Sequence, residues 1–213
     1  MFAEIYQKFI KKVKKKLLIT LIIYFVVGAL LLIFFKKGEF ELWINQQHNS
    51  FFDFIFYYIT FLGDGLFSII FALVIVIYRW KIGVLVGITF AISGLLSLFF
   101  KQIVFPNAPR PAAFFDELKI NSIYYLLSKQ TEINYSNSFP SGHTTTAFAF
   151  FVVLCLWEKT EKYTIIWIFL AFLVALSRVY LVQHFWIDTY FGALLGVFVS
   201  VLVYLLSKKK KFI

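Results

Sequence analysis

The sequence is poor in charged residues and in cysteine. Only 15% of its 213 residues are charged and 61% are apolar, whereas a soluble domain has about a quarter and about half. Cys155 is the one cysteine, which excludes an internal disulfide, and with three histidines the chain lacks the residues for a thiolate zinc site. A soluble globule of this composition would aggregate, so the sequence indicates a protein that resides in a lipid bilayer.

Acidic residues are scarcer than basic ones. Eleven Asp and Glu stand against 21 Lys and Arg, which gives a formal net charge of +10. In a soluble protein this surplus would suggest binding to nucleic acid. Here the basic residues lie mostly in the tails and at the ends of loops, so we expect the membrane bilayer as a partner and no nucleic acid.

The apolar residues come in runs close to the roughly 20 residues that a membrane-spanning helix needs. Lipid offers unpaired backbone groups no partner, and the runs are too long for barrel strands, so we predict an all-α polytopic integral membrane protein with a six-transmembrane-helix bundle. Only the basic turn at residues 79–81 separates the second helix from the third, and the second could begin as early as Phe54. The six predicted helices cover residues 17–35, 66–78, 82–100, 144–157, 164–182 and 187–206.

Basic tails flank this region, at residues 1–16 and 207–213, with the membrane domain at 17–206. The basic start resembles a signal peptide, but the apolar run that follows lacks a small-residue cleavage site, so we expect it to stay as an anchor. With six crossings, 14 Lys and Arg fall on the side of the termini and seven on the other side. The positive-inside rule then predicts cytoplasmic termini and an outward-facing segment 101–140, in what we expect to be a bacterial inner membrane.

Three ionisable residues lie within or against the last apolar runs, where charge is costly and usually functional or paired. Arg178 ends the fifth predicted helix, His184 follows it by six residues, and Asp188 starts the sixth. Because His184 and Asp188 are four residues apart, the carboxylate can reach one imidazole nitrogen and leave the other free.

More polar residues are predicted at the same membrane face. The run Pro140, Ser141, Gly142, His143 enters the fourth predicted helix there. Lys101 ends the third helix, and Arg110 with Pro111 follows after a short loop. We therefore expect three cations and two histidines to lie close together at the outer end of the helix bundle.

These residues resemble the type 2 phosphatidic acid phosphatase family. Ser177 and Arg178, followed after five residues by His184 and after three more by Asp188, match the third motif of that family, and residues 140–143 match the second. In the first motif, Arg110 and Pro111 fit, but eight residues separate Lys101 from Arg110 where the family has six. The resemblance covers roughly residues 60–205 and implies the six-helix layout and a membrane lipid phosphatase that needs no metal and no cofactor.

The chemistry of phosphate esters suits the same residues. Arg110 and Arg178 can fork onto phosphate oxygens, and Lys101 adds a point charge. Backbone N–H groups of Ser141 and Gly142 at a helix start complete an anion cradle. His184, oriented by Asp188, would attack phosphorus to form a phosphohistidine, and His143 would protonate the leaving oxygen and then help water hydrolyse the intermediate. The family assigns the same roles to the matching positions.

Each feature also has a plain structural interpretation. A Ser-Gly-His run at a helix start is usually a cap, an arginine near a helix end can snorkel to headgroups, and a turn-spaced His–Asp pair can be structural. Gly63, Asp64 and Gly65 are expected to form a tight turn, and residues 49–59 an interfacial aromatic helix. The joint occurrence of the motifs in order, on one membrane side, favours an active site over these separate accidents.

We therefore expect a lipid phosphatase that acts at the outer face on an amphiphilic phosphomonoester or diphosphate. Phosphatidic acid, phosphatidylglycerol phosphate, undecaprenyl diphosphate and lipid A phosphates are all candidate substrates. Two alternatives stay open. The same site could transfer phosphate to a lipid or sugar, or a non-enzymatic transporter could use its charged mouth only to bind anionic lipid.

Overall fold

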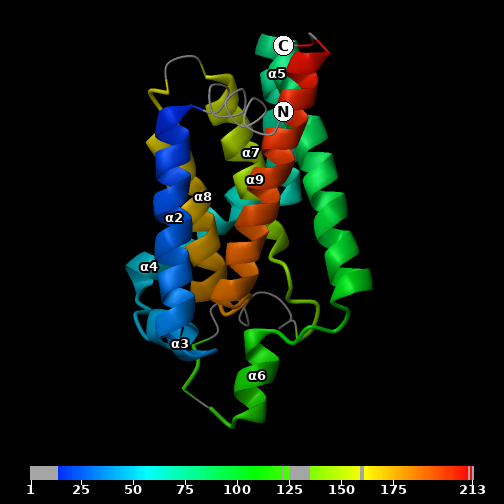
Figure 1. Cartoon of the computed structure of the whole chain (residues 1–213). Coiled ribbons are helices and arrows are strands. Elements are labelled where there is room, and N and C mark those ends of the chain that lie inside the picture. The colour runs from blue at the N-terminus through cyan, green and yellow to red at the C-terminus, as the bar shows by residue number, and fades with distance from the viewer. Residues whose placement is uncertain (1–13, 121, 125–134, 159–160, 211, 213) are drawn as a thin grey trace.

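A computed structural model describes residues 14–120, 122–124, 135–158, 161–210 and 212, and these residues form helices and no strand. Its long helices lie side by side in a bundle, with α6 at the end opposite the start of α2 and the end of α9 (Figure 1). The elements are α2 (Lys15–Phe34), α3 (Glu39–Asn45), α4 (Ser50–Ile59), η1 (Thr60–Gly63), α5 (Gly65–Phe99), η2 (Phe100–Val104), α6 (Pro111–Glu117), α7 (Gly142–Trp157), α8 (Thr164–Tyr180) and α9 (Trp186–Lys209).

The centre of the bundle is α7, which packs against α5, α8 and α9. Every residue of α7 from 144 to 156 is buried, as expected for a helix that is apolar on all sides. On α9, a Cβ added at Gly196 would lie 2.4 Å from the carbonyl oxygen of Thr145. The lack of a side chain therefore lets the α7 and α9 backbones touch, and this contact places the starts of both helices together.

The basic turn predicted at residues 79–81 is present inside α5. Arg79 has φ −147° and ψ 72°, which is not helical. A Cβ added at Gly83 would lie 2.4 Å from the backbone nitrogen of Val76, whereas residues seven apart in a continuous helix are about 10 Å apart. The chain therefore reverses at Arg79, and the two predicted helices form a hairpin.

The idea that the second helix begins near Phe54 is wrong. Residues 50–63 form α4 and η1, and Asp64 caps the start of α5 by accepting a 2.8 Å hydrogen bond from the backbone N–H of Leu66. The helix predicted at 49–59 is present as α4, with Asn49 as its cap. The short helices α3 and α6 were not predicted, because neither contains a long apolar run.

Within the described residues, three helical segments are long and apolar enough to cross a membrane: α2, α9, and α5 continued through η2, which is two helices joined by the reversal at Arg79. With 16 and 17 residues, α7 and α8 are shorter. The all-helical class is confirmed, and the count of six crossings stays a prediction. The tail predicted at 1–16 lies mostly outside the described residues, while α9 extends to Lys209, beyond the predicted domain end at 206.

Candidate active site

The elements that carry the predicted site residues meet at the end of the bundle away from the start of α2 and the end of α9 (Figure 1). This end brings together the start of α7, the end of α8, the start of α9, η2 and the loop before α6. The order of motifs along the chain therefore becomes one cluster in space.

His184 is held by Asp188 and by a residue that sequence reasoning missed, Ser138. The imidazole Nδ1 lies 3.5 Å from Asp188 Oδ2 and 3.3 Å from Ser138 Oγ. The hydroxyl of Ser138 donates its one proton to Asp188 at 2.5 Å, so it can only accept from His184. This assigns the ring proton to Nδ1 and leaves the lone pair on Nε2, as a nucleophile requires.

The loop that carries His184 is tightly bound to the end of α8. The backbone N–H groups of Gln183 and His184 both donate to the carbonyl of Arg178, at 2.9 and 3.2 Å. Val182, a β-branched residue, has a φ of +57°, a conformation that such residues rarely adopt. Strained backbone of this kind is found where the surrounding structure fixes a functional side chain.

Two arginines are positioned by residues far away in sequence. Arg178, with 6% of its surface exposed, donates through Nη1 to the hydroxyl of Thr60 at 2.6 Å. Its buried Nε–H has no acceptor among the described residues. Arg110 donates through Nε to the carbonyl of Ser136 at 2.9 Å and through Nη1 to the carbonyl and side-chain oxygens of Gln183 at 3.2 and 3.1 Å.

Lys101 is close enough to both arginines to interact with them electrostatically, although the spacing to Arg110 is longer than in the family motif. The π-helix η2 and a left-handed residue at Asn107, with φ +62°, take up the extra length. Burial, and then the charges of Lys101, Arg110 and Arg178, hold the pKa of His184 well below its usual range. The imidazole is therefore neutral at pH 7 and stays so below pH 6.5, about where a free histidine becomes charged.

Ser141 differs from its predicted role. Its backbone N–H donates to the carbonyl of Asp188 at 3.0 Å, and its hydroxyl accepts from the backbone and side chain of Thr144. Ser141 is therefore a helix cap and a link between α7 and α9, and its amide is already bonded. The amides of Gly142 and His143 have no acceptor among the residues that the structure describes, so they remain the candidates for contact with an anion.

His143 faces an acidic residue that sequence reasoning assigned only to a turn. Asp64 Oδ2 lies 3.8 Å from His143 Nε2, with both side chains partly exposed. The turn that carries Asp64 is held against α7. Thr146 donates to the carbonyl of Gly63 at 2.6 Å, and a Cβ added at Gly63 would lie 2.6 Å from the carbonyl oxygen of His143. The predicted turn is present, and it also carries a carboxylate to the second histidine.

The arrangement can bind an anion and attack it. Three cations and a second histidine lie close enough to the neutral imidazole of His184 to act on it electrostatically, and its Nε2 has no hydrogen bond to any residue that the structure describes. In the described part of the chain, no group of three or more His, Cys, Asp or Glu side chains is placed to hold a metal ion.

A family model and several known proteins are similar to this chain. The PAP2 superfamily model matches residues 82–212. The bacitracin transport permease protein BcrC of Bacillus licheniformis is 36% identical over 87 residues, which are 41% of this chain and 42% of that protein. The matched part therefore spans less than half the length of that relative.

Two solved structures share the fold. LpxE of Aquifex aeolicus superposes with a TM-score of 0.67 and 26% identity, over 80% of this chain and 96% of that one. A transmembrane PAP2-type phosphatidylglycerolphosphate phosphatase from Bacillus subtilis gives a TM-score of 0.66 and 22% identity, over 92% of this chain and 98% of that one. The apolar helices and these neighbours make the chain an integral membrane protein. Because the family match covers more than half of the sequence and includes all three motifs, the chain belongs to the PAP2 superfamily, as the resemblance implied.

Proposed function

We propose that the protein hydrolyses a phosphomonoester or diphosphate of an amphiphilic lipid through a phosphohistidine intermediate, without a metal ion. The observation that carries this proposal is that His184 is neutral, is oriented by Asp188 and Ser138, and lies within electrostatic reach of Lys101, Arg110 and Arg178. The buried Nε–H of Arg178 supports it further, since this donor has no acceptor among the described residues and would gain one from a phosphate oxygen.

The reaction proceeds in two displacements. Lys101, Arg110 and Arg178 neutralise the phosphate oxygens, and Nε2 of His184 attacks phosphorus. A P–N bond forms while the P–O bond to the lipid breaks. Burial and the charges of Arg178, Lys101 and Arg110 hold the pKa of His143 well below its usual range, so His143 takes up a proton once the bound phosphate has neutralised these cations, and it gives that proton to the departing oxygen. Water then attacks phosphorus, returns a proton to His143 and releases phosphate as the P–N bond breaks.

An amphiphilic substrate is supported by the place of the site at the ends of apolar helices. Beside it runs an apolar groove of about 260 Å³, lined by residues from η2, the segment before α7, and α9. Acyl or prenyl chains can occupy such a groove while the phosphate reaches the cations. The name of one structural neighbour, a phosphatidylglycerolphosphate phosphatase, agrees with one of the candidate substrates. Phosphatidic acid, undecaprenyl diphosphate and lipid A phosphates are the other three.

The first prediction concerns the reaction itself. The purified protein in excess EDTA should release inorganic phosphate from at least one of these four lipids, because the charges that stabilise the transition state belong to the chain. Phosphate release is measured against a control without enzyme. Loss of activity in EDTA with recovery in magnesium would contradict the mechanism.

The alternatives give other outcomes in the same assay. A new phosphorylated lipid or sugar without free phosphate would indicate phosphotransfer. Movement of the anionic lipid across a vesicle membrane without either product would indicate a transporter.

The second prediction separates the two histidines. His184→Ala should abolish the reaction with every substrate, because no covalent route remains. His143→Ala should lose about 100-fold or more with a lipid substrate, yet lose less with nitrophenyl phosphate, whose leaving group departs without a proton. Rapid-quench measurement of the first turnover gives both rates.

Trapping of radiolabelled phosphoenzyme provides the control for this pair. His143→Ala should still become labelled and His184→Ala should not. Label on His184→Ala, or equal losses of the first turnover on both substrates in His143→Ala, would reverse or remove the assigned roles.

The third prediction concerns Asp64, which we assign as a positioning residue for His143. Asp64→Asn keeps the cap of α5, since asparagine caps helices as well as aspartate, but removes the charge 3.8 Å from His143. The variant should lose about fivefold in kcat/KM, the scale of a partly exposed ion pair. The alkaline limb of the pH–rate profile should also move to lower pH, because the carboxylate favours the imidazolium form. Unchanged pH dependence in Asp64→Asn would leave Asp64 as a cap alone.

The fourth prediction concerns sidedness, which we infer from the basic surplus on the side of the termini. On a Cys155→Ala background, Glu117→Cys on α6 should react with an impermeant thiol reagent in intact cells. Trp80→Cys, which is 57% exposed at the other end of the bundle, should react only after lysis. The opposite labelling would place the active site in the cytoplasm.

A further inference from the structure

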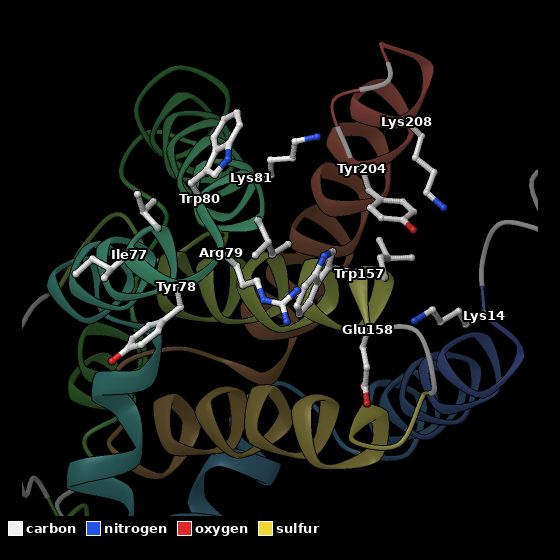
Figure 2. A pocket seen from close by; sticks show the side chains of 13 residues that line it. Lys14, Ile77, Tyr78, Arg79, Trp80, Lys81, Trp157, Glu158, Tyr204 and Lys208 are labelled. Atoms are coloured by element: carbon white, nitrogen blue, oxygen red, sulfur yellow. The ribbon is translucent and has the colours of Figure 1, made fainter.

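A hollow lies at the end of the bundle where α5 reverses and where α7 and α9 end (Figure 2). The reversal of α5 at Arg79, the end of α7, the end of α9 and Lys14 before α2 line it, and its volume is about 670 Å³. Leu156, which lines this hollow, lies 13 residues after His143 in α7, a distance of about 20 Å along the helix. A headgroup bound here is therefore far from the candidate active site.

The lining of the hollow is strongly basic. Lys14, Arg79, Lys81 and Lys208 all contribute, against one acidic residue, Glu158. Both carboxylate oxygens of Glu158 accept from the backbone N–H of Tyr163, and in Figure 2 this carboxylate points away from Arg79. The hollow therefore has a surplus of positive charge.

One of these cations has no hydrogen bond. Glu161 and Glu158 lie close enough to Lys14 to interact with it electrostatically, but its buried Nζ has no hydrogen-bond acceptor among the residues that the structure describes. A buried ammonium without a hydrogen bond is costly, and an anionic oxygen would remove that cost. The hollow thus lacks the kind of group that a phosphate supplies.

The walls of the hollow are apolar and aromatic. Ile77 and Trp80 are 79% and 57% exposed and lie at the turn of the α5 hairpin. The amino group of Lys81 lies 6.0 Å from the centre of the Trp80 ring. The Nζ of Lys208 lies 4.9 Å from the ring centre of Tyr204. Tryptophan and tyrosine beside lysine and arginine mark the depth of lipid headgroups, so an anion bound here would have hydrocarbon next to it.

We propose that this hollow is a binding site for the headgroup of an anionic phospholipid, separate from the catalytic site. The phosphate contacts the basic residues, and the acyl chains lie along the exposed apolar face of the α5 hairpin. A bound lipid would join the turn of α5 to the ends of α7 and α9 and so stabilise the bundle at the end where its helices separate. The proposal is independent of the reaction at His184.

Two neighbouring lysines on α9 provide a matched test. Lys208 lines the hollow and Lys209 does not, and both are exposed residues of the last turn. The purified full chain is titrated with phosphatidylglycerol in a phosphatidylcholine–detergent mixture, and bound lipid is counted by native mass spectrometry. Lys208→Gln should weaken the binding of phosphatidylglycerol about fivefold, the value of one basic residue near a lipid anion, and Lys209→Gln should leave it unchanged.

The melting temperature gives a second readout. Phosphatidylglycerol should raise it in the wild type and in Lys209→Gln, and should raise it less in Lys208→Gln and Arg79→Gln, with all four equal in phosphatidylcholine alone. If Arg79→Gln does not fold, the two lysine variants decide the outcome by themselves.

Three results would overturn the proposal. Equal losses in Lys208→Gln and Lys209→Gln would mean diffuse attraction to charge. Equal binding of phosphatidylcholine and phosphatidylglycerol would remove the need for an anion. An equal rise in melting temperature with inorganic phosphate alone would make the hollow a site for a soluble anion.

Discussion

Asp188 makes the contacts on which the candidate active site depends. Its carboxylate accepts from Ser138 and from the backbone of Phe185 and lies against the ring of His184, while its own carbonyl accepts from the backbone of Ser141. One residue at the start of α9 therefore fixes the imidazole, the segment before α7 and the first turn of α7. Without this link, three separate segments would have to find the same geometry independently.

Hydrogen bonds to the surrounding chain stabilise the cluster of cations in this site. The charges of Lys101, Arg110 and Arg178 repel one another, and burial makes that repulsion stronger. Hydrogen bonds from the arginines to Thr60, Ser136 and Gln183 hold them in place without neutralising them. The charge that remains is available to an anion, and the proposed function assigns it to the phosphate of the substrate.

The sequence predicted most of the fold and the core of this site, because both depend on short-range patterns. Apolar runs located the long helices, the charged triplet at 79–81 located the reversal, and the four-residue spacing paired His184 with Asp188. The supporting residues could not be predicted. Ser138 lies 50 residues from Asp188, and Thr60 lies 118 residues from Arg178. These contacts exist only after α4, α7, α8 and α9 pack together, and no local periodicity encodes them.

The backbone N–H of Ser141 was predicted to be free to bind an anion, because Ser141 stands at a helix start. The glycines of α9 instead let α9 pack closely on α7, and the carbonyl of Asp188 lies 3.0 Å from this N–H and accepts its hydrogen bond. Asp64 was predicted only as a turn residue. In the structure it also lies beside His143, because Gly63 packs directly on the α7 backbone. Tertiary contact decided both cases.

The central claim is that Nε2 of His184 is the nucleophile that attacks phosphorus, close to Lys101, Arg110 and Arg178. An experimental structure of the protein with orthovanadate, which mimics five-coordinate phosphorus, tests it most directly. We expect vanadium bonded to Nε2 of His184, with its equatorial oxygens on Arg110 and Arg178 and an axial oxygen toward His143. Vanadate bonded to His143, or bound without any contact to His184, would contradict the account.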